Sequence, residues 1–356
     1  MSLLNLLKNN KRSIVYTILF LSWLFESLHV ICRSVHRPSH AKKPLLEVSF
    51  LNKPKNIYSI RDTHLEVDPI FNTFDKDFFY NNLLPDQISH KYKPKKYSLK
   101  KDLETQLQVL FEEIKRKKHR REFKEFTHFE ILKKDDFNKK EKSGCLILKF
   151  KDHPFVVKVF MENPRSFVRP YSKGFCPIFF FNMGGGINRH LLGFTRIKNL
   201  YEIKKTIEED PHWSKLISTP RKWFWIPKDC NQMELVGKNF GKRKPIKRVI
   251  PGTYCIIADA IKLKNTTFSL LDGSAKEMCM SLCNFLDVRI DPHIDNFLLE
   301  KGTDKIVIID TEHFPSIVGF KERRQFRSYF SWYYQLSVKC LNDMFFQTKK
   351  ERFTKT

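Results

Sequence analysis

The stretch Asp287–Phe314, which reads DVRIDPHIDNFLLEKGTDKIVIIDTEHF, decides our expectation of the fold. Within it, two short apolar runs, Phe297–Glu300 and Lys305–Ile309, are joined by a turn that carries Gly302, which is typical of a β-hairpin. A polar loop precedes the first run, and Asp310 ends the second. Because both strands bury their apolar residues, we expect the polar side chains to gather at the loop end of the hairpin.

A sharp helix start lies upstream of this hairpin. Ser274 and Glu277 form an S-x-x-E capping box, which satisfies free N–H groups of a first helical turn. An apolar stripe at helical spacing follows, made of Ala275, Met278, Cys279, Leu282, Cys283 and Leu286. The pattern predicts a buried helix that leads into the polar loop.

Three side chains around the hairpin have the chemistry that phosphoryl transfer requires: Asp291, Asn296 and Asp310. In such a reaction one carboxylate orients or deprotonates the attacking hydroxyl, while an amide oxygen and a second carboxylate hold Mg²⁺ on the phosphates. Mg²⁺ prefers hard oxygen ligands and usually keeps several waters besides one or two carboxylates. The loop and the hairpin end therefore predict a nucleotide–metal site.

The pattern D-x-H-x-x-N-[FIL]-L, followed by a hairpin and I-D, resembles the catalytic and metal-binding segment of the protein-kinase-like superfamily. It is most similar to the branch of the aminoglycoside phosphotransferases and choline kinases, in which the metal aspartate lies in I-D-x-E. The resemblance implies that Asp291 is the catalytic base, that Asn296 and Asp310 bind metal and nucleotide, and that Glu312 is the acidic residue after them. It also implies ATP and Mg²⁺ as cofactors.

Upstream, Phe155–Phe160 reads FVVKVF and resembles the V-A-I-K strand of the kinase small lobe. Lys158 alternates with apolar neighbours, so it points away from the face that they bury and toward the nucleotide phosphates. In the family this lysine pairs with a glutamate on a following helix. We expect that helix at Arg196–Glu208, with Glu202 as the partner and Glu208 as the rival candidate.

The sequence also departs from the family pattern. Lys133–Lys142, reading KKDDFNKKEK, stands where a Gly-rich phosphate loop is expected, and Gly184–Gly186 comes only after the strand lysine. Arg289 replaces the usual histidine two residues before Asp291, and no A-P-E segment follows Asp310. These departures favour an alternative function, in which the chain is a catalytically inactive pseudokinase that acts as a membrane-associated binding or scaffold module.

The resemblance implies an α+β, two-lobed protein-kinase-like fold, with an antiparallel β-rich small lobe and a mainly helical large lobe, after an N-terminal hydrophobic helix. We place the small lobe at 122–262 and the large lobe at 263–350. Residues 33–121 are rich in Lys and Pro and are expected to form a basic juxtamembrane spacer, with a helix near 103–117.

The amino terminus differs from the rest of the chain. Residues 1–12 are basic, and residues 13–32, reading SIVYTILFLSWLFESLHVIC, are just long enough to cross a bilayer as a helix. No A-x-A-like cleavage site follows, which favours an uncleaved single-pass anchor with the kinase-like region in the cytoplasm. Secretion after cleavage of a signal peptide is the alternative.

The net charge of +26 raises an anionic membrane surface or nucleic acid as partners. No nucleic-acid-binding signature accompanies the charge, so nucleic acid is not expected, although a basic membrane- or nucleic-acid-binding protein is kept as a third alternative. The expected partners are a membrane, a nucleotide and a hydroxyl acceptor, either a small molecule or an atypical protein substrate.

One further reading concerns metal chemistry. A metallohydrolase could use Asp287, Asp291, His293, Asp295, Asp310 and His313 as ligands. The histidine spacings typical of a metal-binding helix are absent from this stretch, which disfavours that alternative. The eight Cys residues stand singly, without C-x-x-C pairs or zinc spacing, and are expected to be mostly reduced thiols.

Overall fold

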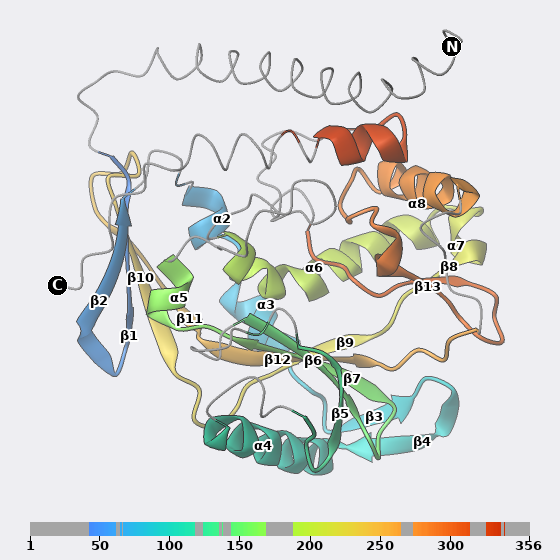
Figure 1. The fold of residues 1–356 in the computed structure, drawn as a ribbon, viewed down its shortest axis with the longest axis horizontal. Helices are drawn as coiled ribbons and strands as arrows, with labels where there is room; N and C mark the ends of the chain where they lie inside the picture. Colours follow the sequence, from blue (N-terminus) through green and yellow to red (C-terminus); the bar gives the residue numbers. More distant parts are fainter. Residues whose placement is uncertain are drawn as a thin grey trace, which may run out of the picture.

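Figure 1 shows the fold of the chain in a computed structural model. The structure describes residues 43–61, 65, 67–117, 124–134, 137, 144–168, 188–264, 273–313, 325–335 and 338. Residues 13–32 and Gly184–Gly186 lie outside the described residues, as do most of Lys133–Lys142.

A five-stranded antiparallel sheet forms the centre of the molecule, in the order β5-β6-β7-β12-β9. Its strands are β5 (Phe129–Lys133), β6 (Gly144–Phe150), β7 (Phe155–Met161), β9 (Lys222–Trp225) and β12 (Thr253–Asp259). In β7, Phe155, Val157 and Val159 are fully buried, whereas Lys158 between them is half-buried and faces the other side. The alternation gives the sheet one mainly apolar face and one face that carries the lysine.

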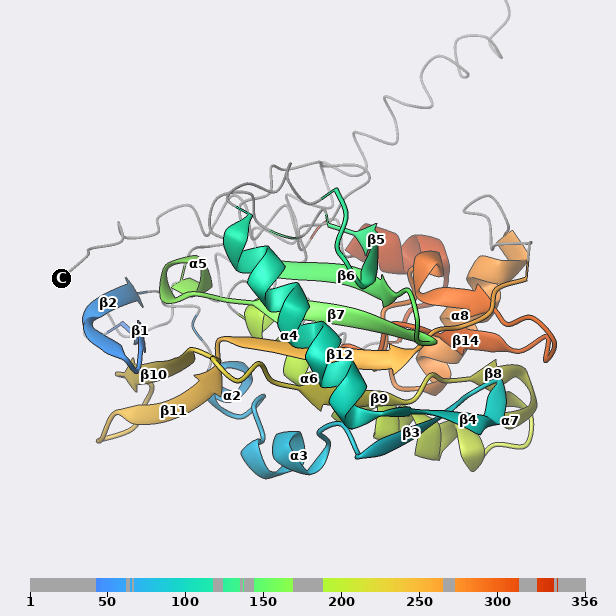
Figure 2. The same ribbon diagram turned by 90° about the horizontal axis from the view of Figure 1, so that it is seen from below.

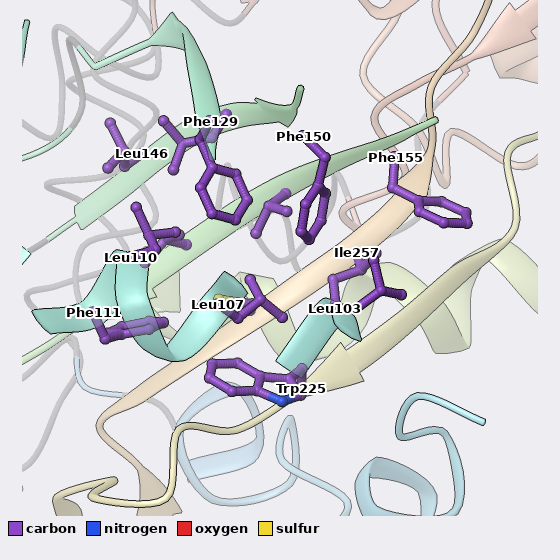
Figure 3. Close-up of a cluster of buried hydrophobic side chains, with 14 of the residues drawn as sticks. Leu103, Leu107, Leu110, Phe111, Phe129, Leu146, Phe150, Phe155, Trp225 and Ile257 are labelled. Carbon is purple, nitrogen blue, oxygen red and sulfur yellow. The ribbon is translucent and has the colours of Figure 1, made fainter. Parts of the chain in front are cut away.

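Helix α4 (Lys100–Arg116) covers the apolar face of this sheet, crossing it diagonally (Figure 2). Its buried residues are Leu103, Leu107, Leu110, Phe111 and Ile114, which recur at helical spacing. Figure 3 shows the first four of these side chains against Phe129, Phe150, Phe155 and Trp225 of the sheet. Complete burial of a large apolar side chain contributes about 1.5–3 kcal/mol, so this cluster is a major source of stability.

Helix α6 (Asn188–Glu208) lies on the opposite face of the sheet (Figure 1). Its first half packs on the sheet through Phe194, whose ring stacks on that of Tyr254 at 4.4 Å between centroids. Its second half places Ile203 and Ile207 in a cluster with helix α8 (Gly273–Phe285). This helix therefore connects the sheet to the carboxy-terminal part of the described chain.

The carboxy-terminal part contains the hairpin expected from the sequence, formed by β13 (Phe297–Leu299) and β14 (Ile306–Ile308). The second strand also pairs in parallel with β8 (Ile217–Ser218), which follows the short helix α7 (Trp213–Leu216). Helix α8 contributes Ala275, Cys279, Leu282 and Cys283 to the core beneath the hairpin. The polar loop 286–293 lies between this helix and a 3₁₀ turn at Ile294–Asn296.

The described residues between 43 and 116, a segment that we expected to be mostly a spacer, form helices and strands. They form β1 (Leu45–Phe50), β2 (Lys53–Arg61), α2 (Val67–Phe71), α3 (Lys76–Asn81), β3 (Gln87–His90), β4 (Lys93–Leu99) and α4. A second antiparallel sheet has the order β11-β10-β1-β2, where β10 is Gln232–Lys238 and β11 is Ile246–Pro251. The short helix α5 (Pro164–Val168) contacts this sheet. The exposed lysines of β2 and β4 hide the apolar alternation that would have revealed these strands.

The expected fold class, an α+β two-lobed protein-kinase-like fold after an N-terminal hydrophobic helix, is wrong. The described residues form a mixed α/β fold with several antiparallel sheets, and strands run from Leu45 to Ile308. The physical reason is long-range pairing: β1 pairs with β10, almost 190 residues later, and no local pattern encodes such a partner. The hydrophobic helix was placed at residues 13–32, outside the described residues, and nothing in the structure supports it.

Among the helices that the structure describes, none combines the length and the apolar character needed to cross a bilayer.

Candidate functional site

The candidate site lies where β7, α6 and the two polar loops of the carboxy-terminal hairpin meet. Lys158 comes from the central sheet, Arg196 from α6, and Asp310 and Glu312 from the chain after β14. Asp291 and Asn296 come from the loop before β13. The hairpin places these two loops together, because Asn296 and Ile309 are joined by a backbone hydrogen bond of 3.0 Å.

Lys158 and Asp310 form the pair at the centre of the site. The Nζ atom of Lys158 lies 3.3 Å from Oδ2 of Asp310, and both side chains are largely buried, with exposures of 16% and 21%. Burial alone would raise the pKa of Asp310, but the charges of Arg196 and Lys158 hold it well below its usual value. Asp310 is therefore a firmly ionised carboxylate at neutral pH.

Arg196 is the second cation of the site and was not among the predicted site residues. It is almost fully buried and donates to Oδ1 of Asp310 through one terminal nitrogen and to Oε2 of Glu312 through the other. Burial opposes its charge, but these two carboxylates raise the pKa of Arg196 above its ordinary value. Its guanidinium also lies 5.6 Å from the ring centroid of Phe160. Arg196 thus holds both carboxylates in fixed positions.

A buried polar frame supports the loop that carries Asp310. Lys222 of β9 donates to the carbonyl oxygen of Ile309 at 3.1 Å and to Oγ1 of Thr311 at 2.7 Å. Thr311 in turn donates to the carbonyl oxygen of Arg196 at 2.7 Å. Burial, and then the charge of nearby Lys158, lower the pKa of Lys222 well below its usual value.

Asn199 joins the two loops from the side of α6. Its Nδ2 donates to the carbonyl oxygens of Arg289 and Thr311, at 3.0 Å each. The same amide thus joins the segment just before Asp291 to the segment just after Asp310. Through this side chain, α6 fixes the distance between the two loops that form the site.

Asp291 differs in its electrostatics from Asp310. Burial raises the pKa of Asp291 to about 7, the charges of Glu312 and Asp310 add to this rise, and the backbone N–H of His293 opposes it. That N–H donates to Oδ1 of Asp291 at 3.0 Å. Asn296 donates from Nδ2 to the backbone carbonyl oxygen of Asp291 at 3.2 Å. Asp291 therefore titrates near neutral pH, as an acid or base in catalysis requires.

Glu202 does not lie with the other predicted residues. It is exposed on α6, on the side that faces a separate pocket, and the carboxylate that pairs with Lys158 is Asp310. The rival Glu208 pairs with Lys204 at 3.5 Å on the surface. The α6 residue that faces the site is the cationic Arg196, so the expected lysine–glutamate pair is replaced by a network of two cations and two carboxylates.

The residues around Asp310 can be compared with the needs of Mg²⁺. Asp310, Glu312 and Asn296 supply hard oxygen atoms, and a carboxylate oxygen that accepts one hydrogen bond keeps a second lone pair. Within the described ranges, no group of three or more His, Cys, Asp or Glu side chains is arranged to hold a metal ion. The described residues therefore form no all-protein metal cage, and a Mg²⁺ at Asp310 would need further ligands from phosphate oxygens and water.

No protein-family model matches the chain, and comparisons with curated proteins and with solved structures find no match.

Sequence reasoning missed Arg196, Lys222 and Thr311 as members of the site. A signal for Lys222 was present, since this lysine begins the strand KWFW, whose other side chains are aromatic, and a lysine in such a strand is either at an edge or buried with partners. Arg196 gave no comparable signal. It begins the helix that we had expected, and only the packing of α6 on the sheet shows which face it occupies.

Proposed function

We propose that the protein is a phosphotransferase that moves the γ-phosphoryl group of ATP to a hydroxyl acceptor. One observation carries the proposal: Asp291, with its pKa near 7, lies in the loop adjoining the ionised Lys158–Asp310 pair. The two carboxylates have environments that push their pKa values apart, which is how an active site separates a proton acceptor from a permanent charge. The resemblance of the loop to the protein-kinase-like superfamily stays a prediction that agrees with this chemistry.

Each residue has a role in the proposed reaction. Asp291 accepts the proton of the acceptor hydroxyl as its oxygen bonds to the γ-phosphorus, while the bond from that phosphorus to the β–γ bridging oxygen breaks and ADP leaves. Lys158 and Arg196 stabilise the negative charge of the transferred group. Asp310 and Asn296 would hold Mg²⁺, which when bound neutralises charge on the phosphate oxygens. Because the groups are held by a buried frame, they need little reorganisation during the transfer.

A second candidate rests on a specific observation. Arg196 forms ion pairs with both Asp310 and Glu312, and Lys158 pairs with Asp310. The positive charges of these two residues therefore balance the two carboxylates. A phosphate or metal must compete with this internal pairing, which favours a pseudokinase that retains the site as a rigid binding or scaffold element. In that case Asp291 has no acceptor to deprotonate.

Equilibrium binding of a fluorescent ATP analogue in the presence of Mg²⁺ tests the nucleotide site that both candidates share. We expect saturable binding that unlabelled ATP displaces, and weaker binding in Lys158→Met. The matched control is Lys149→Met, which removes an exposed lysine from the neighbouring strand β6. Absence of saturable binding to the wild-type chain would overturn the proposal.

Transfer of labelled γ-phosphate, to water and to the protein itself, then separates the two candidates. The phosphotransferase requires measurable release or incorporation that Asp291→Asn abolishes while ATP binding persists. The control Asp295→Asn changes an exposed carboxylate four residues away. Binding without turnover, unchanged by Asp291→Asn, would establish the pseudokinase instead.

A further inference from the structure

A pocket lies against α6, and Asn199, which bridges the two loops of the candidate site, is among the residues that line it. Its volume is about 450 Å³, which is in the range of sites for small molecules. It is enclosed by α6, by the segment that joins α2 to α3, by α3 itself, and by the loops that carry Arg289 and His313. None of the residues assigned to phosphoryl transfer lines it, although Glu202 lies at its wall.

The floor of the pocket is aromatic. Phe74, Phe79 and Phe194 are almost fully buried. Phe194 packs edge to face with the other two rings, at 4.7 and 5.7 Å between centroids, and Phe74 and Phe79 are tilted against each other at 5.4 Å. Phe78 of α3 is half-buried and adds a side wall. Three interlocked rings hold their positions without a ligand, so an apolar or aromatic group can pack on this floor at little conformational cost.

The acidic side chains of the pocket are mostly engaged or open to water. Asp75 pairs with Lys198 at 3.1 Å and caps α3 through the N–H of Phe78. Asp68 accepts a hydrogen bond from Asn72 at 2.9 Å. Glu202 is exposed on α6. Since exposed charges interact through water of high dielectric constant, these carboxylates oppose an anion in the pocket only weakly.

Arg289 is the group that distinguishes the pocket. Its backbone is fixed, because its N–H donates to Leu286 and its carbonyl oxygen accepts from Asn199, both at 3.0 Å. Its side chain is half-buried, and within the described part of the chain the guanidinium makes no hydrogen bond or ion pair. A partly desolvated arginine with open donor positions is a receptor for a carboxylate or a phosphate, which it can bind through two parallel hydrogen bonds.

We propose that this pocket binds a small amphipathic anion, with an acidic head on Arg289 and a flat apolar or aromatic body on the floor formed by Phe74, Phe79 and Phe194. Both parts contribute to affinity, because the head pairs with the guanidinium of Arg289 and the body packs against the rings that line the pocket. The head is a carboxylate or a phosphate, and the shared chemistry is an oxyanion next to a ring. The proposal does not depend on the phosphotransferase assignment.

Isothermal titration of the full-length chain with four probes tests this inference. Phenylphosphate and phenylacetate carry the ring with either head, inorganic phosphate carries the head alone, and phenethylamine carries the ring with a positive charge. We expect at least one of the two aromatic anions to bind at one site, and inorganic phosphate to bind about tenfold more weakly or worse. The stronger aromatic anion identifies the head. Phenethylamine should not bind.

Variants place the site. We expect Arg289→Gln to weaken binding of the aromatic anion by about tenfold or more, because it removes a charge-assisted pair of hydrogen bonds. The matched control Arg243→Gln removes an exposed arginine from the turn between β10 and β11 and should change the affinity by less than about twofold. Phe78→Ala should also weaken binding, and unchanged thermal unfolding without probe shows that each variant is folded.

Any of three results would overturn the inference. In the first, neither aromatic anion binds. In the second, phenethylamine binds as tightly as they do. In the third, Arg289→Gln binds the aromatic anion as tightly as the wild type does, or Lys158→Met abolishes its binding, which would place the anion beside Lys158. Binding that is unchanged in Lys158→Met supports a separate pocket, and this result does not depend on the phosphotransferase proposal.

Discussion

Replacing Asp291 by Asn should stabilise the protein, and should do so more strongly at alkaline than at acidic pH. The pKa of Asp291 in the folded chain is about 7, against an ordinary value of 3.8. A folded-state pKa above the unfolded one means that the folded state binds the proton more tightly. The ionised carboxylate therefore destabilises the fold, and this penalty is absent below the unfolded pKa and complete above the folded one.

The size of the effect follows from the two pKa values. Moving a carboxyl pKa from 3.8 to about 7 corresponds to about 4 kcal/mol at full ionisation, which is an order-of-magnitude figure. Between pH 5 and pH 8 the penalty grows by about 3 kcal/mol, because the carboxyl of the unfolded chain is already ionised while that of the folded chain keeps its proton until the pH passes about 7. Asparagine keeps the Oδ1 atom that accepts from the N–H of His293, so the hydrogen bond is retained.

Urea unfolding of the wild type and of Asp291→Asn at pH 5 and pH 8 measures this difference. Tryptophan fluorescence and circular dichroism should give coincident transitions, which justifies a two-state analysis. The control is Asp295→Asn, whose carboxylate is 77% exposed and which should gain nothing that depends on pH. An Asp291→Asn gain that is equal at both pH values would refute the raised pKa.

Three further predictions concern the frame of the molecule, each read out by urea unfolding. Arg196→Met should destabilise the chain by about 3–5 kcal/mol, because it leaves the buried carboxylate of Asp310 without its main partner. Leu107→Ala should destabilise it by about 2–5 kcal/mol by opening a cavity between α4 and the sheet. Gly193→Ala should destabilise it by about 1–3 kcal/mol, because the added Cβ would overlap the buried Tyr254 ring and hydroxyl.

Each of these three substitutions has a matched control, which makes the same kind of change at an exposed position. Arg243→Met removes an exposed arginine, Leu132→Ala truncates a leucine that is 49% exposed, and Gly273→Ala adds a Cβ with no neighbour within 4 Å. All three should change the free energy of unfolding by less than about 0.5 kcal/mol. A loss in the control equal to that of its partner would show that burial is not the cause.

The sequence by itself determined the local elements and part of the candidate site. The apolar stripe of α8, the hairpin around Gly302 and the alternation of β7 are all encoded within a few residues, because helix and strand periods decide which side chains share a face. The same local order put Asp291, Asn296 and Asp310 at one end of the hairpin, where the structure places them.

Only the tertiary structure decided how distant segments combine. The pairing of β1 with β10 and the packing of α4 on the central sheet depend on complementary surfaces that no short window contains. For the same reason the sequence predicted Glu202 beside Lys158, whereas the rotation of α6 about its axis brings Arg196 to Asp310 and turns Glu202 outward. Helical spacing fixes which residues share a face, but the neighbour of that face is fixed by packing.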